Sequence, residues 1–296
     1  MGTAILSGII SSQGSGSGTQ EIDLLPTRFI ACVRRPESED AIRSKLPREA
    51  PDSTVSVYVK DNCAAAREAD VILLACQPHL YKPLLLESGI CTALKGKPII
   101  SVLAGVTSNE ITHQLCQTAK TESKGVYDTD AFSVIRAMPN IASAVQASST
   151  VLEIHPRPQL KGVIATAHAI FSCVGTVFTT KPGNFAACTT LNGSTPAFFA
   201  MVIDGLVDGA VALGLSHTEA TQMAAATMRG TADLIMSGKS TLDLRYEVAC
   251  PGGATIQGLQ VLEEARTRAV WMRAMAAATS GQSSLKEGLK MSRGGF

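Results

Sequence analysis

The chain has 296 residues, of which 45% are hydrophobic, only 4% are aromatic and 17% are charged. Lysine and arginine total 26 against 25 aspartates and glutamates, giving a formal net charge of +1. A nearly neutral chain without a basic patch argues against a nucleic-acid partner, and the length suggests two domains of roughly 150 residues each.

Short apolar strands and helices alternate through the first half of the chain. Strands are predicted at residues 28–33, 54–58, 70–76, 98–103 and 132–138, and helices at 37–46, 64–68 and 108–117. Strands that are apolar throughout and separated by helices predict a parallel sheet covered on both faces. We therefore expect an α/β, doubly wound (Rossmann) N-terminal domain.

The pattern becomes helical in the second half. A helix at 160–171 and a strand at 176–178 precede Pro182-Gly183, where we place the boundary between domains 1–181 and 182–296. Beyond it, an all-α domain is predicted from helices at 196–213, 218–236, 241–248 and 255–279. Residues from Gly281 onward are expected to fray as a flexible tail.

The helical half is also unusually apolar. The mean hydropathy of the chain is +0.18, and Gly205 and Gly209 stand four residues apart, a spacing that favours close packing of another helix. The sequence contains no run of about 18 uncharged apolar residues, so a membrane span is not predicted. We therefore predict a buried subunit interface, and so a homodimer or a higher homo-oligomer.

Eight cysteines are scattered along the chain without a CxxC pair, and the five histidines do not cluster with them. This spacing predicts neither a metal site nor a disulfide framework. The cysteines are expected to be small buried side chains of a protein in a reducing compartment. No lysine or arginine precedes the first apolar residues, so a signal peptide is not predicted and the cytoplasm is the expected location.

A candidate binding motif lies where the last long helix begins. Gly252 and Gly253 lack Cβ atoms, so a small ligand can approach the main chain there. The first amides of the following helix have no partner within it and suit a carboxylate. Thr255 places a hydroxyl in the same turn. The alternative is that this motif is only a helix entry.

Four blocks of sequence resemble the pyrroline-5-carboxylate reductase family. Residues 189–198 are similar to the family's T-A-L-S-G-S-G-P-A-Y, and residues 134–140 to its V-x-R-x-M-P-N. Residues 101–106 are similar to S-x-x-A-G-V, and residues 249–264 to S-P-G-G-T-T-I-x-G-L-x-x-L-E. The resemblance runs from Met1 to about Ala278. It implies a Rossmann domain, a helical dimerisation domain and NAD(P)H-dependent reduction of 1-pyrroline-5-carboxylate to L-proline, the last step of proline biosynthesis.

The resemblance also implies roles for the motif at residues 250–255. Thr255, the candidate catalytic residue, would form a hydrogen bond with the imine nitrogen. The amides around Gly253, Ala254 and Thr255 would hold the substrate carboxylate, with Gly252 and Cys250 beside them. The family usually has serine at the position of Cys250, and a thiol is a much weaker donor than a hydroxyl. This difference puts the affinity for the substrate, or its identity, in question.

The cofactor is expected to be NADPH, with NADH possible. Dinucleotide folds that bind NAD usually place an acidic residue after the second strand, whereas Arg34 and Arg35 stand there and suit a 2′-phosphate. The alternative is that both arginines are merely solvated. The cofactor-binding residues that the resemblance implies besides them are Gly2, Asn62, Gln77, Pro78, Ala104, Gly105, Pro139 and Asn140. Gln77 replaces the family's usual lysine, and Asn140 could equally cap the following turn.

One part of the family pattern is absent from this sequence. The family opens with a strand and G-x-G-N-M-G-x-A-I, of which only the last glycine, Gly2, and the following helix have a match. We therefore expect the sheet to lack its first, central strand. The first helix is expected to be followed by a linker at residues 11–20. Either the start was assigned too late, or part of the cofactor site was lost.

Two further functions remain open at this point. A reductase of another cyclic imino acid is suggested by Cys250, Asn192 and Thr195, where the family has serine, serine and glycine. A non-catalytic dimeric remnant would follow from loss of the cofactor site.

Overall fold

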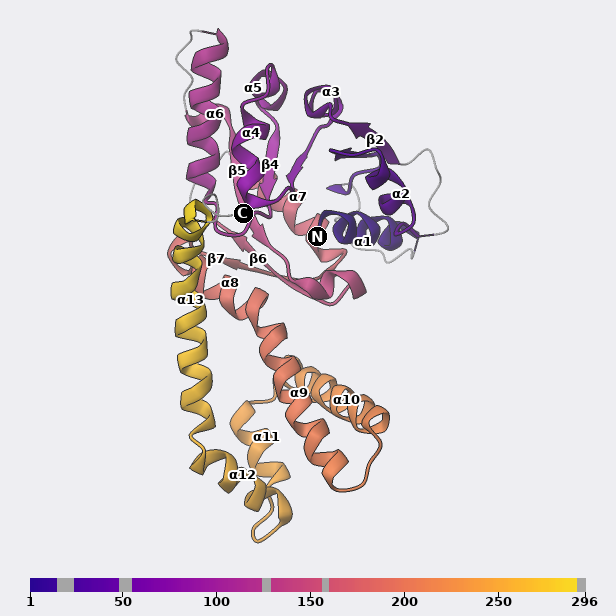
Figure 1. Ribbon diagram of the computed structural model, residues 1–296, viewed down its shortest axis with the longest axis vertical. Coiled ribbons are helices and arrows are strands. Elements are labelled where there is room, and N and C mark those ends of the chain that lie inside the picture. The colour runs from indigo at the N-terminus through magenta and orange to yellow at the C-terminus, as the bar shows by residue number, and fades with distance from the viewer. Residues whose placement is uncertain (15–23, 48–54, 124–128, 156–159, 292–296) are drawn as a thin grey trace. The chain divides into compact units, whose positions relative to one another are not determined.

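The computed structural model describes residues 1–14, 24–47, 55–123, 129–155 and 160–291 (Figure 1). The chain forms two compact units, the first made of Met1–Gly193 with Gly281–Phe296 and the second of Ser194–Ser280. The domain boundary between residues 181 and 182 stays a prediction, because contacts define these units and functional domains need not coincide with them.

The first unit contains the strands of the predicted Rossmann domain. β1 (Phe29–Val33) and β2 (Val55–Val59) pair in parallel as a two-stranded sheet. A five-stranded sheet has the order β3-β4-β5-β6-β7, formed by Ile72–Leu74, Pro98–Ser101, Ser133–Met138, Ser148–Glu153 and Gly175–Thr180.

The predicted strands up to β5 pair in parallel, as expected, but β6, which was not predicted, pairs differently with β5. β5 and β6 are antiparallel, while the other pairs run parallel. Residues 139–147, which join β5 to β6, form only a short 3-10 helix at Ile141–Val145. A parallel return needs a crossover of a dozen or more residues, so this short connection requires the antiparallel arrangement.

Helices cover both faces of these sheets, as a doubly wound fold requires. Ile5 and Ile9 of α1 (Gly2–Gly14) share a buried cluster with Ile100 of β4 and with Ile170 of α7 (Lys161–Ser172). A second cluster holds α5 (Ile90–Leu94) and α6 (Ser108–Ser123) against β4. The remaining helices of this part are α2 (Glu37–Arg43), α3 (Asn62–Glu68), α4 (Tyr81–Leu85) and α8 (Phe185–Thr189). α2 ends earlier than predicted, and α4, α5 and α8 were not predicted.

The sheet is divided between β1 and β3. Within the described residues no strand lies between them, so each has an edge without a strand partner. Residues 11–14, which were expected to be linker, belong to α1, whereas residues 15–20 of that predicted linker lie outside the described residues.

The second unit is all-α, as predicted. Its helices are α9 (Thr195–Ala212), α10 (His217–Met236), α11 (Thr241–Val248), α12 (Ala254–Glu264) and the first part of α13 (Thr267–Met291). One continuous helix over 255–279 is wrong, because Arg266 has a left-handed φ of 54° between α12 and α13. The frayed tail is also wrong as far as Met291, where α13 ends.

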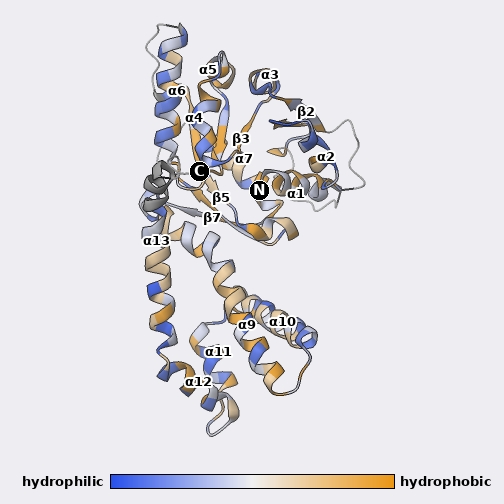
Figure 2. Ribbon diagram, viewed as in Figure 1, coloured by the Kyte–Doolittle hydropathy of each residue, from blue (hydrophilic) through white to orange (hydrophobic). Residues whose placement is uncertain are grey.

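Many large apolar side chains of the second unit are exposed. Examples are Phe199, Met201 and Leu206 of α9, which is predominantly apolar along its length (Figure 2). The segment Pro182–Ala212 is long and apolar enough to cross a membrane, and 11% of its most apolar stretch is buried. However, Asp204 and Asp208 lie in α9, and carboxylates are costly within a bilayer. Burial of these apolar side chains against another protein surface is therefore more favourable than their insertion into a membrane.

Candidate functional site

The predicted cofactor residues follow the carboxyl ends of successive strands. Arg34 and Arg35 come after β1, Gln77-Pro78 after β3, Ala104-Gly105 after β4 and Pro139-Asn140 after β5. In open α/β sheets, ligands bind at this edge. Each of these predicted residues thus follows the carboxyl end of a strand, although they are far apart along the sequence.

The ends of β1 and β3 lie near one another. Burial raises the pKa of the Cys76 thiol, and the nearby charge of Arg34 opposes part of this increase. Arg34 and Arg35 are exposed, and within the described part of the chain neither has an ion pair. They are therefore available to an anionic group, as a 2′-phosphate contact requires.

The other predicted cofactor residues near the division of the sheet differ in whether their side chains already have hydrogen-bond partners. Asn62 lies in the first turn of α3, and its Nδ2 donates to both carboxylate oxygens of Glu87, at 2.8 and 3.1 Å. Gln77 is exposed and occupies the N-cap position of a short 3-10 helix that begins at Pro78, without a capping hydrogen bond from its side chain. Gly2 starts α1, where an added Cβ would lie 3.1 Å from Cβ of Ala75. Asn62 is thus already engaged, whereas the side chain of Gln77 faces solvent.

The loop after β4 has the shape expected of a ligand cradle. Gly105 has a φ of +73°, which favours glycine, and an added Cβ would meet no atom within 4 Å. Ala104 beside it is exposed. The loop is therefore open, and its main chain is accessible to a ligand. With the free arginines, this fits a dinucleotide.

Asn140 caps the turn after β5 and also ties it to a neighbouring segment. Its Oδ1 accepts from the amide of Ala142 at 3.1 Å, and its Nδ2 donates to the carbonyl of Asn192 at 3.2 Å. Pro139 is buried. The capping alternative for Asn140 is therefore confirmed, and its place as a cofactor contact stays a prediction.

Asn192 was not predicted as a site residue, although its departure from the family block was noted. It lies in a π-turn at Thr190–Ser194 and is 4% exposed. Its Nδ2 donates to the carbonyl of Met138 at 2.6 Å, which fixes the orientation of the amide. Its buried Oδ1 has no hydrogen-bond partner among the described residues. Asn192 and Asn140 thus bind each other's segments and hold the end of β5 in place.

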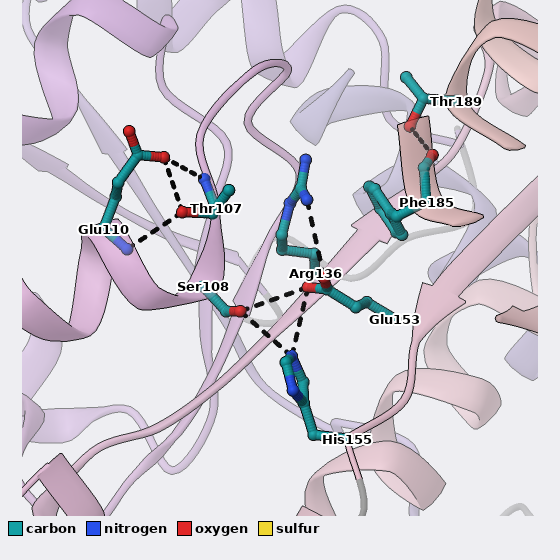
Figure 3. A network of polar contacts seen from close by, with 8 residues as sticks. All are labelled: Thr107, Ser108, Glu110, Arg136, Glu153, His155, Phe185 and Thr189. Atoms are coloured by element: carbon teal, nitrogen blue, oxygen red, sulfur yellow. Dashed lines mark hydrogen bonds and ion pairs between the residues drawn. The ribbon is translucent and has the colours of Figure 1, made fainter. Parts of the chain in front are cut away.

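A buried polar network lies beside this end of β5 (Figure 3). Arg136 of β5 is 3.8 Å from Glu153 of β6 and stacks on the ring of Phe185 at 4.0 Å. Burial lowers the pKa of Arg136, although the Glu153 charge opposes this.

The same network contains a serine, a histidine and a glutamate, but not as a nucleophilic triad. Ser108 Oγ lies 3.3 Å from Nε2 of His155, and Glu153 Oε2 lies 3.5 Å from the same nitrogen. In a triad the serine and the carboxylate bind opposite nitrogens of the imidazole. This arrangement therefore ties β5, β6 and the start of α6 together and does not activate Ser108.

The predicted substrate residues all lie in the second unit, at the start of α12. Gly252 has a φ of +70°, and the amide of Gly253 donates to the carbonyl of Cys250 at 3.0 Å. Gly253 is the N-cap of α12 and offers no side-chain cap, and the first turn contains no acidic residue. The first amides of α12, from Ala254 on, are therefore free for an anion.

Thr255 is exposed in this first turn, as is Cys250 just before it. The Thr255 hydroxyl forms no hydrogen bond with the described residues. The loop thus presents free main-chain amides, one hydroxyl and one thiol to a small acidic ligand.

The described residues also include several free cysteines and a hollow beside α6. The prediction of buried cysteines holds for Cys91 and Cys116 but is wrong for Cys32 and Cys250, which are exposed. Among the described residues no group of three or more histidines, cysteines and carboxylates is arranged to hold a metal ion. A hollow of about 660 Å³ between α4 and α6 is lined by none of the predicted site residues.

Comparison with known proteins identifies two family models along the chain. Residues 182–285 match a model described as pyrroline-5-carboxylate reductase dimerisation. Residues 1–105 match one described as NADP oxidoreductase, coenzyme F420-dependent.

Relatives match nearly the whole chain. Delta-1-pyrroline-5-carboxylate reductase kk1I of Curvularia clavata is 44% identical over 94% of this chain and 86% of its own length. Pyrroline-5-carboxylate reductase of Lophium arboricola is 40% identical over 98% of this chain and 92% of its own. The solved pyrroline-5-carboxylate reductase of Coxiella burnetii is 26% identical with a TM-score of 0.77, covering 96% and 94% of the two chains. The Plasmodium falciparum pyrroline carboxylate reductase, solved with NADP bound, shares the fold at 20% identity and a TM-score of 0.70, with coverage of 96% and 94%.

Proposed function

Because this chain belongs to the pyrroline-5-carboxylate reductase family, we propose that it reduces 1-pyrroline-5-carboxylate to L-proline with NADPH. The observation that carries the proposal is the start of α12, where free amides and the Thr255 hydroxyl face solvent together. A cyclic imino acid offers a carboxylate to the amides and a ring nitrogen to the hydroxyl. NADPH oxidation that depends on the imine, with L-proline as the product, tests the proposal.

The chemistry needs little from the side chains beyond position and hydrogen bonding. A bound nicotinamide would supply the hydride that reduces the C=N bond. The amides of Ala254 and Thr255, at the positive end of α12, hold the substrate carboxylate. The Thr255 hydroxyl forms a hydrogen bond with the imine nitrogen, as donor to the free imine or as acceptor from its protonated N–H, and this bond fixes the ring orientation. A cyclic imine is basic enough to arrive protonated or nearly so, and no histidine or glutamate catalyst is therefore needed.

NADPH is the proposed cofactor in preference to NADH. Exposed Arg34 and Arg35 directly follow β1, at the position where an arginine accommodates a 2′-phosphate. Gly105 leaves the loop after β4 open for the main chain to approach the cofactor. Gly2, Asn62, Gln77, Pro78, Ala104, Pro139 and Asn140 complete the proposed set, with Asn62 needing to exchange Glu87 for a cofactor contact.

We also propose that the enzyme is a cytoplasmic homodimer or a larger homo-oligomer. The match to a dimerisation model over residues 182–285 supports assembly through the second unit, and the exposed apolar side chains of α9 supply the surface. The cytoplasm is supported by eight free cysteines, which suit a reducing compartment. The comparisons favour neither a different imino acid nor a non-catalytic remnant.

Replacing Cys250 with serine tests the carboxylate end of the proposed substrate site. Serine restores a hydroxyl, and a hydrogen bond gained to a carboxylate is worth about 1 kcal/mol or more, which corresponds to about a fivefold lower KM. We expect KM for 1-pyrroline-5-carboxylate to fall by that factor, with little change in KM for NADPH. Steady-state kinetics of both proteins measure this.

The control is Cys188→Ser, which changes a cysteine outside the proposed site. Equal KM values for Cys250→Ser and the unchanged protein would show that residue 250 does not contact the substrate.

A further inference from the structure

The end of β2 carries a third cation beside the two arginines. β1 and β2 pair in parallel with Val33 opposite Val59, and the amide of Lys60 donates to the carbonyl of Val33 at 2.9 Å. This bond extends the ladder by one residue, so Lys60 lies across from Arg34. Neighbouring strands are about 4.8 Å apart, which places these two residues side by side at the carboxyl edge of the sheet.

The backbone at Lys60 is unusual. Its φ is 56°, in the left-handed region that favours glycine, and the residue is exposed. The chain turns here from β2 into α3, whose N-cap is Asp61. A side chain with a Cβ costs free energy in this conformation, and such positions are found preferentially at binding and catalytic sites. The chain turns away from the sheet directly after β2, so Lys60 lies at the carboxyl edge of the sheet and not within a strand.

The carboxylates near this edge are bound elsewhere. Asp61 accepts from the amide of Ala64 at 3.0 Å, and Glu87 holds the amide of Asn62. Glu68 of α3 accepts from the hydroxyl of Tyr58. By contrast, Lys60 and the two arginines form no ion pair within the described part of the chain. The charges of Glu87 and Asp61 still act at this edge, because both raise the pKa of the Cys32 thiol on β1, but neither carboxylate is ion-paired with these three cations.

We propose that Lys60 joins Arg34 and Arg35 in binding the 2′-phosphate of NADPH, and so determines cofactor specificity. This inference rests on the proposed function. Arginines can hold two phosphate oxygens in a fixed fork, whereas a lysine supplies a compact charge on a flexible stem. The lysine reaches the phosphate from the strand next to the arginines, so the phosphate is contacted from two sides.

Calorimetric titration of the full chain with adenosine 2′,5′-bisphosphate and with ADP separates the 2′-phosphate from the rest of the nucleotide. We expect Lys60→Met to raise Kd for the bisphosphate about tenfold and to leave Kd for ADP unchanged. The matched control is Lys45→Met, an exposed lysine after α2, which should change neither. Lys60→Gly removes the same charge without the left-handed cost, and should show the same loss even if Lys60→Met folds poorly.

The outcomes distinguish this inference from the proposed cofactor. If the unchanged chain prefers the bisphosphate and both Lys60 variants retain that preference, Lys60 is not a ligand while the assignment of NADPH stands. If the unchanged chain binds both nucleotides equally, or neither, both the preference for NADPH and the role of Lys60 are wrong. An equal loss for bisphosphate and ADP would show that Lys60 acts on the fold of the edge and not on the phosphate.

Discussion

Replacing Thr255 with alanine is expected to lower kcat/KM for 1-pyrroline-5-carboxylate by about 10²–10³-fold. The Thr255 hydroxyl is exposed in the first turn of α12, next to amides that have no acceptor. Its loss removes the hydrogen bond that orients the imine nitrogen, while the helix retains its backbone. We therefore expect the melting temperature to change little. Steady-state kinetics and thermal denaturation of the same preparations measure both quantities.

Two variants sharpen this test. Thr255→Ser keeps a hydroxyl at the same position and should retain most of the activity. Thr241→Ala removes an exposed threonine from the first turn of α11, a similar position outside the proposed site, and should leave kcat/KM unchanged. Full activity of Thr255→Ala would remove this residue from the mechanism.

Changing Arg34 to aspartate together with Arg35 to alanine is expected to shift the preference from NADPH toward NADH by about 100-fold or more. Each hydrogen bond to a charged group contributes about 1.5–3 kcal/mol, and aspartate can accept from a ribose hydroxyl while repelling a phosphate. The ratio of kcat/KM for the two cofactors measures the shift.

The control for the arginines is Arg43→Ala. Arg43 lies at the end of α2 and is paired with Glu39 at 2.9 Å, so its charge is already matched. If the double variant keeps the cofactor ratio of the unchanged protein, Arg34 and Arg35 are solvated surface charges.

The fold was largely predictable because its elements have strong periodic patterns. The core strands β4 and β5 are mostly apolar, with Arg136 as an exception in β5, and α11 was predicted with its observed bounds. The break between α12 and α13 was not predictable, because Ala265 and Arg266 are ordinary helix residues and no glycine or proline marks the stop. The antiparallel β5–β6 pair was missed because β6 was not predicted as a strand, and its direction depends on the length of the connection and not on strand composition.

The site was predictable where the main chain itself is the ligand-binding group. Gly252 and Gly253 before an apolar helix indicate the free amides directly from sequence. The role of Asn192 could not be found in this way, because its partner Met138 is far away in the sequence and a buried asparagine has no local signature. Lys60 was missed for a similar reason, since only the pairing of β1 with β2 brings it opposite Arg34.

The division between β1 and β3 has a consequence for local stability. A two-stranded sheet is only marginally stable by itself, so β1 and β2 should open more often than β4 and β5, which have neighbours on both sides. Amide hydrogens of β1 and β2 should therefore exchange with solvent faster than those of β4 and β5.

A ligand that binds the cations after β1 and β2 should reduce this difference in amide exchange rates. At a concentration of 100 times Kd, a ligand specific for the closed form stabilises it by about 2.7 kcal/mol, which slows exchange through that opening about 100-fold. Adenosine 2′,5′-bisphosphate should protect the amides of β1 and β2 in this way and leave those of β6 and β7 nearly unchanged. The part of the sheet that is least stable alone would then be the part that the cofactor orders, and cofactor binding would include the completion of local folding.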